Sequence, residues 1–409
     1  MGGSNRDRVR RRRVFYVPGY DPFHPRRYRE LYRKEAAAQA AISGYEIGLK
    51  PKRAGDHGYG WHVSARIGEE AVDADIEVLV WSDIVRKSMS HGIAQTYWQL
   101  LRTAWVYVAS GAIFRLMRLR KGPTIAAFYP IALLLLQLAL AGLAGWGLAR
   151  GLGWGLAAAG LPAASGWIGG AALTWAVLWR FRKADGRFYA YYLMHDYAFT
   201  AQSGGANPPA LEARMAEFGD RIAEALLQDW DEVLVVGHSS GAHLAVSVLA
   251  DLVRAGRVPE RGPALGFLSL GHVVPMASFL PRAQKLRGDL AYLSARRELT
   301  WVDVTAPGDG CAFALCDPVS VSGVAPEDKR WPLVVSAAFT QTLSPERWSA
   351  LRWRFFRLHF QYLCAFDRPG DYDYFRITAG PRTLAARYRD RVPSKSRIER
   401  PASGYRDVA

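Results

Sequence analysis

The sequence predicts an α/β protein in which a mostly parallel sheet, with helices on both faces, is interrupted by a two-helix transmembrane hairpin. Three observations lead to this prediction. Short apolar runs alternate with helix-periodic segments on both sides of residues 123–180, which is typical of parallel strands joined by helices. Residues 123–180 themselves hold two long apolar segments. A later apolar run ends in a serine flanked by glycines, which is the strongest chemical motif of the chain.

Composition and charge limit the classes of protein that this chain can belong to. It has 409 residues, of which 50% are hydrophobic, so it can bury a sizeable core in one large domain with an insertion or in two modest domains. A formal net charge of +16 predicts attraction to an anionic partner, either nucleic acid or a phospholipid surface. Three cysteines, Cys311, Cys316 and Cys364, are too few for a disulfide framework and fit a reducing compartment.

We expect five segments along the chain. No apolar stretch of signal-peptide length follows the first arginines, so no secretion signal is expected. The segments are a basic N-terminal tail at 1–13, the first part of the core with an interfacial helix at 14–122, the hairpin at 123–180, the second part of the core at 181–393, and a polar C-terminal tail at 394–409.

The first part of the core begins with alternating short elements. Residues 14–17 read as a short strand, 26–41 as a helix with apolar residues at helical spacing, and 76–81 as a continuous apolar strand. Residues 93–119 mix tryptophans and aliphatic residues with arginines. We therefore expect them to form a helix that lies along a membrane or packs under the core.

The two apolar segments run over 123–149 and 153–179, and each is long enough to cross a bilayer as a helix. Soluble helices of this length nearly always show a polar face, which these segments lack. Basic residues flank the pair at both outer ends, and only Arg150 lies between the segments. Because positive residues stay on the cytoplasmic side, the pattern predicts a multi-pass protein of the inner (cytoplasmic) membrane whose two large soluble portions face the cytoplasm. The basic segments are expected to attract anionic lipid headgroups, and nucleic acid is not expected as a partner.

The second part of the core again alternates strands and helices. The apolar runs are short and continuous, as in strands buried on both faces. We expect strands at 232–236, 265–270, 299–304 and 333–337, and helices at 211–228, 241–255 and 283–296.

Ser239 lies in the segment Gly237-His238-Ser239-Ser240-Gly241, between a buried apolar strand and an Ala/Leu/Val-rich helix. A sharp strand-to-helix turn holds such a serine in a strained, exposed position, and the flanking glycines remove clashes at the turn. The start of the helix directs positive peptide ends at a developing oxyanion. This context predicts that Ser239 is a catalytic nucleophile.

At these residues the sequence resembles the α/β-hydrolase superfamily of serine hydrolases. Residues 14–21 look like the family's early strand and oxyanion loop, and the resemblance implies backbone oxyanion donors at Tyr20 and Ser240. The family usually has antiparallel strands before this point, and almost nothing precedes it here. The sheet is therefore either truncated at that edge or completed by the segments around 44–50 and 61–67.

The resemblance also implies an acid and a histidine, in that order, after the serine. Asp309, in a Pro-Gly-Asp-Gly turn beyond a predicted strand, is the first choice for the acid, with Asp303 inside the strand as the alternative and Asp317 third. His359 is the one histidine beyond Asp309, so the order selects it. Three other histidines are expected to line the pocket: His238, His195 and His272.

We therefore expect a membrane-anchored serine hydrolase that cleaves an ester, a lipid or lipophilic acyl ester, through a Ser-His-Asp triad. An acyltransferase or thioesterase with the same triad, or a non-catalytic membrane scaffold that retains the fold, are the alternatives. Cys311 and Cys316 have no matching second pair of ligands, so no metal site is expected. No Walker loop or dinucleotide motif is present, and no cofactor is expected.

Overall fold

The computed structural model describes residues 7–52, 58–90 and 92–409, and the described chain is built around one eight-stranded sheet. This confirms the predicted α/β class. The strand order is β2-β3-β4-β1-β5-β6-β7-β8. The strands are β1 (Arg11–Val17), β2 (Glu46–Pro51), β3 (Tyr59–Ile67), β4 (Glu70–Val78), β5 (Glu232–His238), β6 (Ala264–Leu270), β7 (Leu299–Thr305) and β8 (Leu333–Ser336).

The sheet is mixed. β2 pairs with β3 and β3 with β4 in antiparallel register, whereas the pairings from β4 through β1 and on to β8 are parallel. Of the two arrangements that the sequence left open for this edge, the structure has the completed one, because the segments near 44–50 and 61–67 form β2 and β3. The fourth strand begins at Glu70, earlier than the apolar run predicted, because its antiparallel partner β3 extends the pairing back to that residue.

Alternate side chains of each central strand enter two separate cores. In β1, Val14 and Tyr16 face one core, and Phe15 and Val17 face the other. The first core is covered by α1 (Arg26–Ser43), η3 (Gln361–Leu363), α17 (Tyr374–Thr378) and α18 (Leu384–Tyr388). The second is covered by α2 (Ser82–Ser88), α9 (Pro209–Leu226), α10 (Gly241–Arg254) and α12 (Gln284–Ser294). Short helices α11 (Val274–Ser278), α13 (Pro318–Val321), α14 (Phe339–Thr342), α15 (Pro345–Leu351) and α16 (Phe355–His359) lie in the connections after β6, β7 and β8.

Both predicted tails contribute to the folded body. β1 begins at Arg11, so residues 11–13 form sheet and not tail, and residues 1–6 lie outside the described residues. Arg12 is fully buried because its Nε donates to Glu232 Oε2 at 2.6 Å and its Nη1 to the Gly380 carbonyl at 2.7 Å. At the other end, the Ile398 amide donates to the Leu315 carbonyl at 2.7 Å, and Ser403 is buried. Internal partners for the polar groups explain why these charged segments are ordered.

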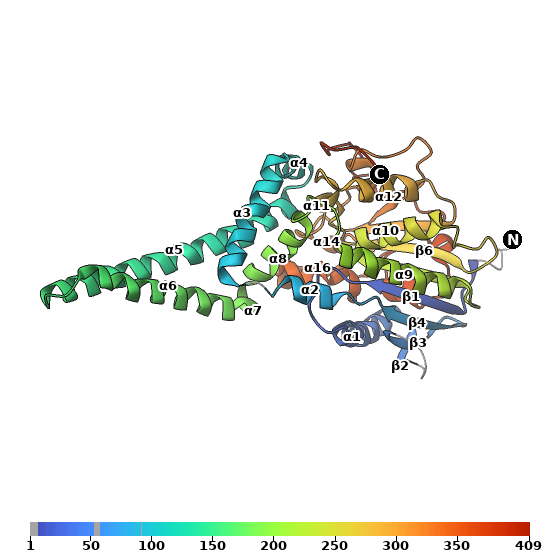
Figure 1. The fold of residues 1–409 in the computed structure, drawn as a ribbon. Helices are drawn as coiled ribbons and strands as arrows, with labels where there is room; N and C mark the ends of the chain where they lie inside the picture. The colour runs from blue at the N-terminus through green and yellow to red at the C-terminus, as the bar shows by residue number, and fades with distance from the viewer. Residues whose placement is uncertain (1–6, 53–57, 91) are drawn as a thin grey trace.

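A long helical pair projects from the body, formed by α5 (Lys121–Ala158) and α6 (Gly166–Lys183) (Figure 1). The predicted boundary between the two apolar segments was wrong, because α5 continues through Gly153 and the turn lies at residues 159–165, which include Pro162 and η2 (Ala163–Ser165). Among the described residues, one helix, α5, is long and apolar enough by length and composition to cross a membrane. At 1.5 Å per residue its 38 residues extend over about 57 Å.

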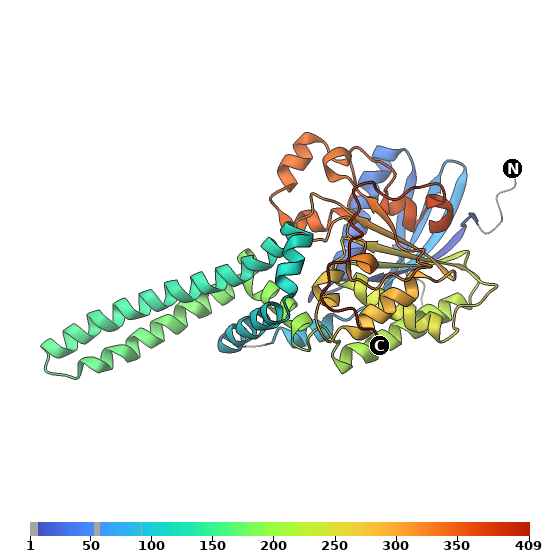
Figure 2. The same cartoon turned by 90° about the horizontal axis from the view of Figure 1, so that it is seen from above.

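The predicted helix at 93–119 is divided in two at the root of the pair. Gly111, with φ of 69°, separates α3 (Ile93–Ala109) from α4 (Ala112–Leu119). α3 lies across the root, where it packs against α8 (Ala190–Ala201), which follows the short α7 (Asp185–Phe188) (Figures 1 and 2). One face of α3 is buried at Leu100 and Tyr107, while Trp98 and Trp105 are exposed on the other.

Candidate active site

Ser239 occupies the turn between β5 and α10 in a left-handed conformation, with φ of 58°. Few non-glycine residues adopt this region, and such strain is held in place only by the surrounding structure. Here the Ser239 amide donates to the Leu270 carbonyl at 2.9 Å, which ties the turn to the end of the neighbouring strand β6. The serine side chain is half-buried and lines a pocket at this edge of the sheet.

The flanking glycines are required by close backbone contacts. A Cβ at Gly241 would lie 2.2 Å from the Val17 carbonyl oxygen, and one at Gly237 would lie 2.7 Å from Ala242 Cα. No flexible side chain could relieve either clash, because the opposing atoms belong to the backbone. The glycines therefore allow the serine turn to sit directly against the end of β1.

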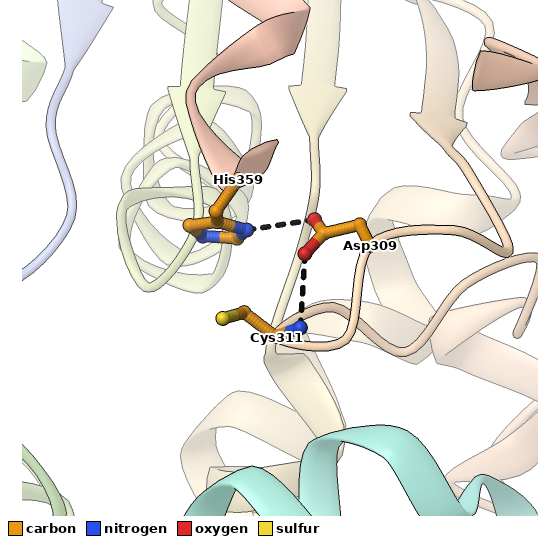
Figure 3. A group of neighbouring side chains, drawn as sticks. All are labelled: Asp309, Cys311 and His359. Atoms are coloured by element: carbon orange, nitrogen blue, oxygen red, sulfur yellow. Dashed lines mark hydrogen bonds and ion pairs between the residues drawn. The ribbon is translucent and has the colours of Figure 1, made fainter. Parts of the chain in front are cut away.

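His359, at the end of α16, and Asp309, in the loop after β7, form a buried hydrogen-bonded pair. His359 Nδ1 lies 2.7 Å from Asp309 Oδ2, and the other carboxylate oxygen accepts the Cys311 amide at 2.9 Å (Figure 3). Burial alone would raise the pKa of the Asp309 carboxyl, but the nearby His359 and these hydrogen bonds lower it below its ordinary value. Asp309 is therefore an ionised carboxylate that orients the imidazole.

Tyr362 supports this carboxylate and was not predicted from the sequence as a site residue. Its hydroxyl donates to Asp309 Oδ2 at 3.1 Å and accepts the Ala306 amide at 3.0 Å. The tyrosine is fully buried, three residues after the histidine. That proximity to His359 was the available signal, but a tyrosine in an aromatic segment reads equally well as core.

Ser239 and His359 line the same pocket, a cavity of about 100 Å³ between the carboxyl ends of β1 and β5 and the helices α8 and α16. The described structure has no hydrogen bond between Ser239 Oγ and His359. Pro123, at the start of α5, lines the same cavity, so the root of the helical pair forms part of its wall.

The two predicted oxyanion donors lie side by side but differ in their hydrogen bonding. The Tyr20 amide donates to Ser240 Oγ at 2.8 Å, so in this state it is occupied. In the described part of the chain, the Ser240 amide has no acceptor. Gly19 allows the two segments to approach closely, because a Cβ there would lie 3.0 Å from Ser239 Cβ. Both donors are thus beside the serine, and one becomes available only when the Ser240 hydroxyl moves.

Of the three histidines predicted to line the pocket, only His238 does so. Its ring packs against His359 with centroids 4.9 Å apart, and its Nε2 bonds to the His359 carbonyl at 3.0 Å. Burial lowers the pKa of His238 to about 3, so it is a neutral support for His359. The predictions for His195 and His272 were wrong: His195 turns toward α3, where Nδ1 bonds to Gln99, and His272 is fully buried against the Cys316 carbonyl.

The two alternative acids lie elsewhere. Asp303 is buried within β7, where it accepts Ser269 Oγ at 2.5 Å and lies 3.6 Å from His272 Nε2. Burial raises its pKa well above the ordinary value. Asp317 caps α13 by accepting two backbone amides at 3.0 Å. Among these three carboxyl groups, only Asp309 contacts His359.

Asp196 is a pocket residue that the sequence analysis missed. Helix α8 directs it, with Tyr192 and Thr200, into the cavity, whereas the adjacent His195 points away. Burial raises the pKa of Asp196 to about 7, and the nearby His359 opposes this shift. The helical spacing of residues 192, 196 and 200 was the available signal in the sequence. It could not be used because no helix was predicted over these residues.

Possible ligand atoms of Asp309, Cys311 and His359 all lie within 4.8 Å of one another, a spacing suited to a metal ion (Figure 3). Their existing contacts explain the cluster in another way. Both Asp309 oxygens already accept hydrogen bonds. Burial raises the pKa of the Cys311 thiol, whereas a metal ligand would be the thiolate. The arrangement fits an acid–base pair better than a set of metal ligands.

Comparisons of the chain with protein-family models, curated proteins and solved structures find no match.

Proposed function

We propose that this protein is a membrane-anchored serine hydrolase of the α/β-hydrolase superfamily that cleaves an ester. One observation carries the proposal: a strained serine at a strand-to-helix turn lines the same pocket as a buried, carboxylate-paired histidine. Nucleophile, base and orienting acid come from three separate segments of the chain, and this convergence is the pattern that acyl transfer requires. Fold and site support the reaction class, while the substrate is inferred separately.

In the proposed reaction, Ser239 Oγ attacks the ester carbonyl carbon, and His359 Nε2 accepts the hydroxyl proton. Asp309 keeps the proton on Nδ1 and stabilises the imidazolium. When the carbon–oxygen bond of the ester breaks, the leaving alkoxide takes the proton from His359 and an acyl-serine remains. Water then attacks the acyl-serine with His359 again as base, which releases the acid and restores Ser239.

The tetrahedral intermediates place negative charge on the former carbonyl oxygen. The Ser240 amide, at the start of α10, is the first donor for this charge. The Tyr20 amide becomes the second when the Ser240 hydroxyl rotates away from it. Each such donor is worth about 10²–10³ in rate in enzymes of this kind.

The membrane anchor in this proposal is the α5–α6 pair. Most of the exposed large apolar side chains among the described residues lie between 98 and 189, including Leu136 and Leu143 on α5 and Trp175 on α6. Exposed apolar surface of this extent marks contact with lipid or protein. Both spans would return to one side, as the flanking cations predicted, so both soluble parts would face the cytoplasm.

Packing within the pair supports the same proposal. Small residues recur every fourth position on both helices, at Gly145, Ala149 and Gly153 on α5 and at Gly166 and Gly170 on α6. A Cβ at Gly170 would lie 2.5 Å from the Gly145 carbonyl oxygen, so the backbones are in direct contact. Close backbone approach through small residues is typical of helices that associate inside membranes.

A fluorophosphonate probe tests the hydrolase proposal, because it reacts covalently with activated serines. We expect the purified full-length protein in detergent to be labelled, and the Ser239→Ala variant to show no labelling. Absence of labelling in folded wild-type protein would contradict the proposal and favour a non-catalytic membrane scaffold. If acyl-serine forms but is discharged faster to an alcohol or amine than to water, the protein is an acyltransferase.

A further inference from the structure

A second, larger cavity lies beside the active site, at the root of the helical pair. Its volume is about 1010 Å³, and it is bounded by the end of α4, the start of α5, the loop at 307–314 and the segment around α15 and α16. We call it the root groove. Nothing in the proposed acyl-transfer steps uses it, so its residues need another explanation.

The root groove concentrates positive charge without internal compensation. Four cations line it: Arg118, Arg120, Lys121 and Arg352. In the described ranges, no carboxylate lies within ion-pair distance of any of them. The one acidic residue in the lining, Asp309, is already bonded to His359. The groove is therefore set up for an anionic ligand.

Part of the root-groove wall is apolar. Phe114, Trp353 and Phe355 line it, and their exposed fractions are 57%, 72% and 47%. Large exposed aromatic side chains at one site are costly in water and mark a surface that contacts apolar groups. A ligand that matches both features has an anionic group and a long apolar part.

The root groove adjoins both the helical pair and the active site. Pro123 lines the groove and the Ser239 pocket, and Asp309 belongs to the groove wall as well as to the pair with His359. The apolar outer surface of α5 begins at Ile125, two residues beyond Pro123. A lipid beside α5 would therefore meet the groove before it meets the serine.

We propose that the root groove binds an anionic phospholipid from the bilayer and presents its acyl ester to Ser239. The phosphate lies among Arg118, Lys121 and Arg352, and the acyl chain lies along Phe114 and Phe355. This inference names the substrate class of the proposed hydrolase, so its catalytic part rests on that function, while the binding part does not. Arg120 is structural in this scheme, because its Nε donates to the Ala314 carbonyl at 2.8 Å.

Binding is tested with Ser239→Ala protein in neutral detergent micelles, so that no turnover occurs. Photoactivatable phosphatidylglycerol is compared with the matching phosphatidylcholine, and the crosslinked peptides are mapped by mass spectrometry. We expect crosslinks at 114–123 and 348–355. The anionic lipid should be preferred about tenfold, since each basic residue near its headgroup contributes to the binding free energy. The triple variant R118Q/K121Q/R352Q should lose the preference.

The matched control removes three exposed cations from the body, in the variant K50Q/R66Q/R261Q. It has the same change in net charge and should keep the preference. Equal crosslinking of both lipids would overturn the proposal, as would loss of the preference in both variants. Suppression of the crosslinks by free inorganic phosphate at millimolar concentration would assign the groove to a soluble anion and also overturn it.

Hydrolysis assays test the hydrolase function and phospholipid binding by the root groove separately. Wild-type protein should release fatty acid from phosphatidylglycerol in mixed micelles, and R118Q/K121Q/R352Q should do so about tenfold more slowly. The triple variant should hydrolyse a short water-soluble ester at the wild-type rate, because it leaves the triad intact. If the wild-type protein does not hydrolyse the soluble ester, the proposed hydrolase function is contradicted. An equal rate on phosphatidylglycerol for wild type and triple variant would contradict only the groove.

Discussion

The body built around the sheet and the root of the helical pair differ in how their cations are paired. In the body, two arginines near the start of the chain have carboxylate partners: Arg12 is buried against Glu232, and the exposed Arg11 pairs with Asp229 at 2.7 Å. At the root of the pair, Arg118 and Lys121 line a groove without carboxylate partners. The two basic clusters look alike in sequence. They differ in their ion-pair partners, and in our proposal the cations without carboxylate partners are the ones that recognise a ligand.

Charge placed on the apolar surface of the pair should have the largest effect. Leu136 and Leu143 are 53% and 66% exposed, so lysine at both positions would fit a soluble protein without cost. Within a bilayer each lysine costs about 2.5–3.5 kcal/mol on insertion scales. We expect Leu136→Lys/Leu143→Lys to be released from membranes by alkaline carbonate, whereas wild type stays in the pellet.

Leu227 supplies the control for this comparison, since it is exposed on the body. Leu227→Lys should fractionate as wild type does. Retention of the double lysine variant in the carbonate-washed membrane would show that the pair does not span the bilayer.

In the body, neutralising the orienting carboxylate should nearly abolish activity while leaving the fold intact. We expect Asp309→Asn to slow fluorophosphonate labelling by about 10⁴-fold, because an amide favours the wrong imidazole tautomer. Asp303→Asn is the matched change, since Asp303 is buried against Ser269, away from His359. It should alter the labelling rate less than tenfold. An equal loss of labelling rate in both variants would contradict the proposal that Asp309 orients His359.

The buried arginine of β1 should matter for stability and not for chemistry. Arg12→Met leaves Glu232 as an unpaired buried charge, which typically costs about 3–5 kcal/mol. Arg118→Met, at the exposed cluster, should change stability by less than about 0.5 kcal/mol. Denaturant unfolding of both variants in detergent measures the difference, and equal stabilities would contradict the contrast between the two clusters.

The smallest expected effect concerns Asp196. Because its pKa is raised in the folded state to about 7, folding takes up a proton between about pH 4 and 7, and wild-type stability falls as pH rises through that window. Asp196→Asn removes this dependence. The variant should unfold a few degrees higher than wild type at pH 8, with a smaller gap at pH 5. A gap that does not grow with pH would refute the raised pKa.

Local signals were sufficient for the parts of the molecule that depend on neighbouring residues. The alternation of apolar runs and helical spacing predicted β5, α10 and the turn at Ser239, because strand, glycines and helix are adjacent in sequence. The order of residues along the chain was sufficient to select His359, and the turn around Asp309 favoured that residue as the acid. In the structure Asp309 contacts His359. These inferences needed no knowledge of distant packing.

What could not be predicted depends on contacts between distant segments. The burial of Arg12 requires Glu232, which is 220 residues away. The orientation of α8, which turns His195 out of the pocket and Asp196 into it, follows from packing against α3. The first apolar helix was predicted to end too early. Its glycines would end a helix in a soluble protein, but in α5 the helix continues past them because they pack against the small residues of α6.

The adjacent serines of the turn allow the most direct test of the central claim. Wild-type protein is labelled with a fluorophosphonate, digested, and the modified residue is located by tandem mass spectrometry. The account predicts a single adduct on Ser239, whose left-handed backbone holds it at the pocket beside His359. It also predicts that the Ser240→Ala variant still carries the adduct on Ser239. An adduct on Ser240, or no adduct on folded protein, would contradict the account.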